Sequence, residues 1–477
     1  MKLIKNYLYN VGYQIFVLII PLITVPYVSR VLGSEGVGIN AYTNSIISYF
    51  VLFGSIGINL YGNRTIAYVR DNREKLTQTF WEIAFLRIFV IMISYVVFLI
   101  FLSFIKQYQI FYFYQSFLIL AAGLDISWFF MGIEDFKKTV ARNMLVKLTS
   151  LVAIFILVKD QSDIGVYILI LSISTLLGNL TLWPYLKKIV TKPNWKNLNL
   201  KSHIMPSLAL FIPQIATQIY LVLNKTMLGY MTNVQNAGFY ENSDKLVKIV
   251  LAIVTATGTV MLPRMANTFS SGNMKLVNKY VRLSFDFVSA ICFPMALGLA
   301  AVAPSFSVWF FGKDFAITGT LIPILSIVII FIGWSNVLGT QYLLPTNQTK
   351  YFTISVTAGA IANLVLNLGL INIYGIYGAI WATVISEFVV TTVQIFLIHN
   401  QFSIYKLFQG TWKYLCASVV MFILVRLANM KMPGTFGSFV IQIFIGLLIY
   451  IILIAVLRAP ILGQIMDLKN KVYDLSN

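Results

Sequence analysis

Long apolar runs, interrupted by short polar segments, are the dominant pattern along this chain. Each run has about the 20 residues that one helix needs to cross the hydrocarbon core of a bilayer. The runs are continuous rather than alternating, which is atypical of membrane β-strands. The pattern predicts an all-α integral membrane protein with about 14 transmembrane helices, over residues 7–29, 38–61, 79–104, 109–131, 140–158, 165–185, 204–230, 239–262, 280–303, 315–338, 351–371, 374–399, 412–428 and 439–457.

Composition agrees with a chain that lies mostly in lipid. Of its 477 residues, 58% are hydrophobic and 11% are charged, whereas soluble domains carry roughly 25% charged residues. The first run is too long for the apolar region of a signal peptide and lacks a small-residue cleavage motif, so we expect it to be retained as a span. His203, His399, Cys292 and Cys416 show no metal-ligand spacing, so we expect no metal site and no cofactor.

Positive charge predicts the orientation of the spans. The chain has 35 Lys and Arg residues against 16 Asp and Glu residues, a net charge of +19. If the N-terminus is cytoplasmic, most Lys and Arg residues fall in cytoplasmic loops, as the positive-inside rule requires. We therefore expect both termini in the cytoplasm, and we interpret the surplus as an attraction to anionic membrane lipids rather than to nucleic acid.

An internal repeat links the first two predicted spans to the seventh and eighth. Its members occur in the same order in both copies: Pro21, Leu32-Gly33, Tyr42, Gly57 and Arg64, then Pro213, Leu228-Gly229, Tyr240, Gly258 and Arg264. Six spans separate the copies, so both enter the membrane in the same direction, a construction found in transporters.

The repeat predicts the domain organisation. We expect two parallel six-helix bundles at 1–200 and 201–400, related by a pseudo-twofold axis along the membrane normal, and two additional transmembrane helices with a cytoplasmic tail at 401–477. Pro21 and Pro26 in the first span, and Pro206 and Pro213 in the seventh, remove backbone hydrogen bonds. These prolines indicate either helices that bend during function or helices with a static kink.

Ionisable residues within the predicted spans are candidates for function, because each needs a partner or a wet cavity. Arg87 and Asp125 lie at similar depth, which allows either a structural ion pair or a cavity lining. Glu387 lies near the middle of its span. Burial raises the pKa of a carboxyl group, so Glu387 is a candidate for ion coupling, unless Asn363 and Asn367 hold it in a static hydrogen-bond cluster.

A polar stripe opens the eighth predicted span. Glu241, Asp244, Lys245 and Lys248 share one helical face through spacings of three and four. Together with Arg30, Glu35, Asn224 and Lys225 they predict a polar mouth between the bundles, with several cations that suit an anionic, phosphate-bearing ligand. The alternative for Arg30 and Lys225 is that these long side chains reach the membrane interface from an apolar surface.

Four segments resemble one family: PLITVPYVSRVLGSEGVGINAYTNSI, GNRTIAYVRDNREK, LDISWFFMGIEDFKKTVARN and VMLPRMAN. They are similar to the polysaccharide-transporter flippases of the multidrug/oligosaccharidyl-lipid/polysaccharide exporter superfamily. The resemblance implies a bacterial cytoplasmic-membrane flippase that moves undecaprenyl-pyrophosphate-linked oligosaccharide by alternating access, for capsule or exopolysaccharide assembly. It also implies coupling to H⁺ or Na⁺ and a cationic central cavity, with Arg30 and Arg87 at positions where such proteins place basic residues.

Other functions within and outside this class are compatible with parts of the same sequence pattern. A teichoic-acid precursor is an equally compatible cargo. A drug or cation antiporter of the same superfamily is less compatible, because cationic drugs need acidic cavity residues and this chain offers more cations than acids. An enzyme is not expected, because no long outward loop, phosphate-binding loop or paired-carboxylate motif is present.

Overall fold

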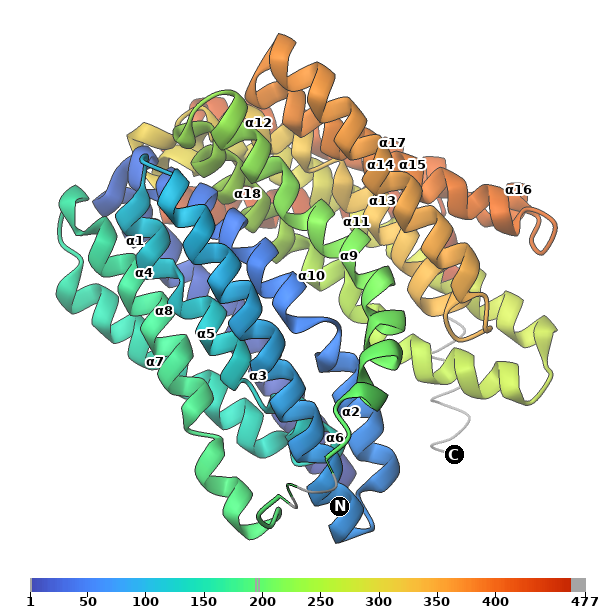
Figure 1. The fold of residues 1–477 in the computed structure, drawn as a ribbon. Coiled ribbons are helices and arrows are strands. Elements are labelled where there is room, and N and C mark those ends of the chain that lie inside the picture. Colours follow the sequence, from blue (N-terminus) through green and yellow to red (C-terminus); the bar gives the residue numbers. More distant parts are fainter. Residues whose placement is uncertain (1, 194, 196–197, 465–477) are drawn as a thin grey trace. The chain divides into compact units, whose positions relative to one another are not determined.

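The computed structural model describes residues 2–193, 195 and 198–464, and this part of the chain is helical without a strand (Figure 1). Twelve segments within it are long and apolar enough to cross a membrane. The first, Ile19–Val69, includes the second predicted span and part of the first. The predicted all-α, multi-span membrane fold is confirmed. The tail after residue 464 and the side chain of Pro213 lie outside the described residues.

The chain forms two compact units, Met1–Gly238 and Phe239–Asn477. In the first unit α9 packs against α1, α2 and α3. The division at 1–200 and 201–400 stays a prediction from the repeat. The first unit contains α1 (Lys2–Ser55), α2 (Ile58–Val69), α3 (Arg73–Phe104), α4 (Gln109–Gln115), α5 (Phe117–Leu124), α6 (Ser127–Gly132), α7 (Phe136–Leu157), η1 (Gln161–Asp163), α8 (Ile164–Leu180), η2 (Trp183–Lys188) and α9 (Lys201–Met231).

The second unit begins within α10 and ends after α18. Its helices α11 and α17 pack closely, as do α14 and α15 (Figure 1). Its elements are α10 (Val234–Ser270), α11 (Met274–Phe311), η4 (Lys313–Phe315), α12 (Thr318–Leu325), α13 (Val328–Ser335), η5 (Asn336–Leu343), α14 (Thr349–Tyr374), α15 (Ile376–Ile398), α16 (Ile404–Leu407), α17 (Thr411–Lys431) and α18 (Phe436–Val456).

Helix α18 shows how polarity is distributed across a span. Phe444, Leu448 and Ile452 are exposed, whereas Gln442 is 1% exposed and accepts a hydrogen bond from Asn429 at 3.0 Å. A polar side chain facing lipid would lose its hydrogen bonds without replacement, so polar groups turn inward and apolar groups turn outward. This distribution of polar and apolar side chains is typical of a helix that spans a membrane.

Two glycines interrupt the helix in the region of the first two predicted spans, Gly33 in the predicted connection between them and Gly57 within the second. Within the described part of α1, the helical backbone is interrupted at Gly33, which has φ 67°, and not at the prolines. Gly57, with φ 74°, ends this segment and starts α2. The corresponding glycines of the second copy, Gly229 and Gly258, lie inside α9 and α10. The repeated sequence therefore takes a different local backbone in each copy.

Candidate functional site

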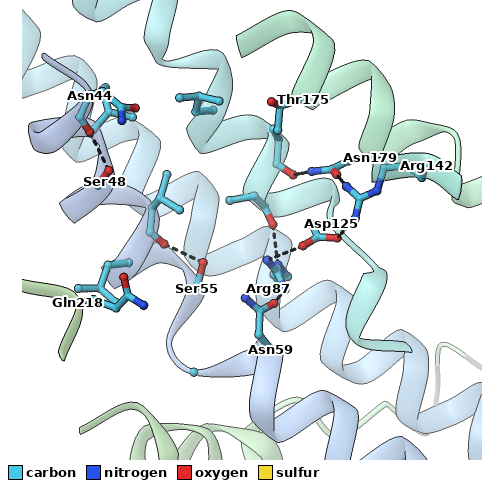
Figure 2. Close-up of a pocket in the computed structure, with 17 residues that line it drawn as sticks. Asn44, Ser48, Ser55, Asn59, Arg87, Asp125, Arg142, Thr175, Asn179 and Gln218 are labelled. Carbon is cyan, nitrogen blue, oxygen red and sulfur yellow. Dashed lines mark hydrogen bonds and ion pairs between the residues drawn. The ribbon is translucent and has the colours of Figure 1, made fainter. Parts of the chain in front are cut away.

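A cavity of about 470 Å³ lies within the first unit. Seven helices and the break between α5 and α6 contribute to it, and polar side chains from these elements turn into it (Figure 2). Its lining residues are Asn44, Ile47, Ser48, Val51, Leu52, Ser55, Gly57, Asn59, Arg87, Leu118, Ala121, Ala122, Asp125, Arg142, Thr175, Asn179 and Gln218.

Arg87 is the most deeply placed charge of this cavity. It lies 14 residues into α3, about 21 Å along the helix at 1.5 Å per residue, and is 2% exposed. Its Nε donates to the carbonyl of Ala122 at 2.6 Å and its Nη1 to Asn59 Oδ1 at 2.7 Å. These partners hold the guanidinium in one orientation, as a buried cation requires.

Asp125 lies between two arginines. Its Oδ2 is 3.9 Å from Arg87 Nη2, and its Oδ1 is 3.7 Å from Arg142 Nη2. The residue occupies the break between α5 and α6, where Oδ1 accepts a hydrogen bond from the backbone N–H of Ser127 at 2.9 Å. The broken helix leaves this N–H without an intrahelical partner, and the carboxylate accepts its hydrogen bond at the start of α6. The same carboxylate faces the two guanidinium groups.

Arg142 supplies the second guanidinium from α7. It donates to Asn179 Oδ1 (Figure 2) and, at 3.2 Å, to Ser127 Oγ. Asn179 in turn donates to the carbonyl of Ala121 at 2.6 Å. The buried Nε of Arg142 has no hydrogen-bond partner among the described residues. The network therefore retains a donor that could bind an additional acceptor.

The charge balance of the cavity is positive. Two guanidinium groups and one carboxylate are the only charged side chains among its lining residues. Guanidinium groups bind phosphate oxygens with two parallel N–H donors, and their attraction is strengthened where lipid and protein exclude water. The arrangement can hold an anion such as a phosphate or a pyrophosphate.

Backbone geometry brings α9 against this cavity. A Cβ atom at Gly57 would lie 2.8 Å from the carbonyl oxygen of Ser207 and 3.0 Å from the backbone nitrogen of Phe211. Ser207 Oγ donates to the carbonyl of Ile56 at 2.5 Å. Since Gly57 has no side chain, α9 can approach the α1–α2 break closely. Gln218, further along α9, is among the lining residues.

The predicted residues of the first unit are only partly brought together. Arg87 and Asp125 meet in the cavity, and their pairing includes Arg142 as a third member. Arg30 is exposed on α1, Asn224 is buried in α9, and both have interaction partners; neither is among the cavity's lining residues, nor is the partly exposed Lys225.

The predicted polar stripe of the second unit forms pairs along α10. Lys245 Nζ is 3.0 Å from Glu241 Oε1, and Lys248 Nζ is 2.6 Å from Asp244 Oδ2. Both pairs place the acid four residues before the lysine, the favourable order on a helix. The four residues therefore carry no net charge.

Glu387 is partly buried in α15 of the same unit and interacts electrostatically with Lys248. Of the two asparagines that were its alternative partners, Asn367 donates to Asn363 at 2.9 Å. The cation near Glu387 thus comes from another helix, which the spacing within one span could not reveal.

Two parts of the first unit were missed in the sequence. Arg142 is not among the ionisable residues that the sequence singles out, although it lies six residues into α7. His203 is considered in the sequence only as a metal ligand. Its Nε2 lies 2.8 Å from Glu82 Oε2 and its Nδ1 lies 2.6 Å from Tyr61 OH, so the side chain joins the start of α9 to α3 and α2. The internal position of Glu82 in an apolar span was the available signal for this second network.

Comparisons with known proteins support the resemblance. A putative O-antigen transporter of Escherichia coli (strain K12) is 24% identical over 84% of this chain and 97% of its own length. The lipid II flippase MurJ of Bacillus subtilis (strain 168) is 28% identical over 29% of this chain and 26% of its own. A solved structure of the lipid II flippase MurJ in an inward closed conformation has the same fold, with a TM-score of 0.78, 16% identity, and coverage of 94% of this chain and 98% of that one. The model of the family described as "Polysaccharide biosynthesis protein" matches residues 3–269, and the chain belongs to this family.

Proposed function

We propose that this protein is a flippase for a lipid-linked glycan in the bacterial cytoplasmic membrane. Its cargo is an undecaprenyl-pyrophosphate-linked oligosaccharide, moved from the inner to the outer leaflet by alternating access for capsule or exopolysaccharide assembly. The names of the relatives, an O-antigen transporter and a lipid II flippase, support a lipid-linked saccharide as the cargo class. These relatives are named as transporters and flippases rather than as enzymes.

The cavity around Arg87 carries this proposal. A lipid pyrophosphate must leave water to cross the bilayer, and its negative charge then needs fixed cationic donors. Arg87 and Arg142 supply such donors around one carboxylate, and Asn59 and Asn179 orient them. In this proposal the pyrophosphate competes with Asp125 for the two guanidinium groups. The two arginine side chains therefore need not move when the pyrophosphate binds or leaves.

Replacement of Arg87 tests the proposal. Arg87→Gln removes the buried charge, so the rate of translocation is expected to fall about 30-fold or more, equivalent to roughly 2 kcal/mol for charged hydrogen bonds. The measurement uses proteoliposomes with a fluorescent undecaprenyl-pyrophosphate oligosaccharide, quenched from outside by dithionite. Arg73→Gln, at an exposed arginine at the start of the same helix, is the matched control and keeps the wild-type rate.

Two results would contradict the proposal. A correctly folded Arg87→Gln variant that flips the labelled lipid at the wild-type rate would exclude the cavity as the pyrophosphate site. A wild-type protein that exports a cationic dye and does not move the labelled lipid would favour a drug or cation antiporter.

Coupling to H⁺ or Na⁺ is the second part of the proposal, and Glu387 is the residue we assign to it. The residue is partly buried and interacts electrostatically with Lys248. Glu387→Gln cannot change charge, so this variant is expected to keep gradient-independent exchange of the labelled lipid while losing its acceleration by an imposed pH or Na⁺ gradient. Retention of that acceleration would remove Glu387 from the coupling mechanism.

A further inference from the structure

A second cavity, of about 500 Å³, lies wholly within the second unit and takes no part in the proposed translocation site. It is formed where α11, α16, the beginning of α17 and the segment after α18 come together. We propose that it binds the phosphodiester headgroup of an anionic glycerophospholipid at the membrane interface. Four features of the cavity support this ligand.

The first feature is charge. Arg282, Lys406 and Lys413 line the cavity with a single acid, Asp286. Asp286 Oδ1 accepts from the Tyr414 hydroxyl at 2.8 Å, and its Oδ2 accepts from Gln464 Nε2 at 2.6 Å. The carboxylate is thus held by neutral donors, and no ion pair to any of the three cations occurs among the described residues. A phosphate would meet three positive groups.

The second feature is the helix terminus that opens into the cavity. Gly410 precedes α17 with φ 88° and supplies no capping side chain. The N-terminus of a helix carries a partial positive charge that favours an anion. Gly410, Trp412 and Lys413 all belong to the lining, so this terminus adds to the field of the three cations.

The third feature is the pair of aromatic residues at the rim. Tyr405 is 79% exposed and Trp412 is 57% exposed. Amphipathic aromatic rings gather at the level of lipid headgroups, because one part of the ring is apolar and another is polar. Lys413 Nζ also lies 5.9 Å from the centre of the Trp412 ring. The cavity therefore has the composition of a membrane interface.

The fourth feature distinguishes a lipid from free phosphate. Leu415, Val419, Ile423 and Leu427 are all exposed and follow one another at intervals of four along α17. Residues at this spacing form one stripe along a helix. The stripe starts one turn after Trp412, so acyl chains attached to a bound headgroup can lie along it. An inorganic phosphate would gain nothing from this surface.

Native mass spectrometry of the full chain in detergent, titrated with phosphatidylglycerol, tests the site. The triple variant Arg282→Gln, Lys406→Gln, Lys413→Gln is expected to bind phosphatidylglycerol at least about tenfold more weakly, given the attraction of each basic group for anionic lipid. The control triple variant Lys275→Gln, Lys279→Gln, Lys350→Gln removes three exposed lysines elsewhere in the same unit. It loses the same net charge and is expected to stay within about twofold of the wild type.

Several results would overturn the proposal. Equal weakening in both triple variants would indicate diffuse attraction rather than a site. Wild-type binding in the first triple variant, or equal binding of phosphatidylcholine by the wild type, would exclude it. Displacement of phosphatidylglycerol by millimolar inorganic phosphate would indicate a site for free phosphate.

A single substitution keeps the test independent of folding. Lys406 is exposed on the four-residue helix α16, so Lys406→Glu leaves the packing intact. It is expected to weaken phosphatidylglycerol binding about fivefold or more, because one attraction becomes a repulsion. Unchanged affinity in Lys406→Glu would also overturn the site.

Discussion

The two cavities of this protein use positive charge in opposite ways. In the first unit, the Arg87 guanidinium is buried and bonded to a carbonyl and an amide, and it shares a carboxylate with Arg142. In the second unit, Arg282 and Lys406 are exposed, and the carboxylate of Asp286 is held by neutral donors. A buried cation must be positioned by partners, whereas an exposed one is solvated by water and stays mobile.

This difference predicts how each cavity responds to its ligand. The donors of the first cavity are fixed before binding, which favours selection of one anion geometry. The cations of the second can adjust to lipid headgroups that differ in shape, and salt screens them more strongly. We therefore expect a selective site in the first unit and a tolerant one in the second.

The largest expected contrast comes from neutralising the acid in each cavity. Asp125→Asn leaves Arg87 and Arg142 without a counter-charge, although an asparagine oxygen can still accept from the Ser127 N–H. Its free energy of unfolding should fall by about 3 kcal/mol, as when a buried ion pair loses one partner. Asp286→Asn removes a carboxylate beside exposed cations and should cost about 1 kcal/mol or less. Thermal unfolding in detergent measures both.

Inorganic pyrophosphate sharpens this comparison. An anion that enters the first cavity replaces the missing carboxylate, so millimolar pyrophosphate should raise the melting temperature of Asp125→Asn more than that of the wild type. The same addition should raise the melting temperature of Asp286→Asn no more than that of the wild type, because its arginine cavity keeps the carboxylate of Asp125. Equal loss of stability in the two variants, with no preferential rescue, would show that the two cavities do not differ in this way.

The sequence carried enough information for the membrane fold because lipid imposes one rule on every span. Twenty apolar residues form a helix whatever their neighbours are, and helices such as α14 and α15 agree with their predicted ranges within a few residues. Arg87 and Asp125 could be selected for the same reason, since charges stand out in apolar runs. Their common cavity depends on how α3 and the α5–α6 break pack, which no local pattern records.

Arg142 and Gly57 illustrate the limit of the sequence. Arg142 lies close to a predicted loop, where a cytoplasmic charge is ordinary, so only tertiary packing identifies it as part of the cavity. In the sequence, Gly57 is a member of the repeat together with Gly258. Only the backbone shows that Gly57 adopts φ 74° while Gly258 lies inside a helix.

Glycine substitutions give the smaller and finer test, because one glycine with positive φ lines each cavity. Gly57→Ala places a Cβ 2.8 Å from the backbone oxygen of Ser207, and Gly410→Ala places one 2.6 Å from Pro460 Cγ, while Gly272→Ala, at φ 75°, meets nothing within 4 Å. Left-handed backbone alone costs an alanine about 1 kcal/mol, which is the loss expected for Gly272→Ala. A proline ring can shift more easily than the backbone of α9. The free energy of unfolding should therefore fall by about 2 kcal/mol in Gly57→Ala, and by an amount between this value and that of Gly272→Ala in Gly410→Ala.

Translocation should slow only in Gly57→Ala, because only there is α9 displaced from the arginine cavity. If all three variants lose the same stability and flip lipid equally well, the close approach of α9 to Gly57 does not shape the site, and the arginines alone determine what the first unit binds.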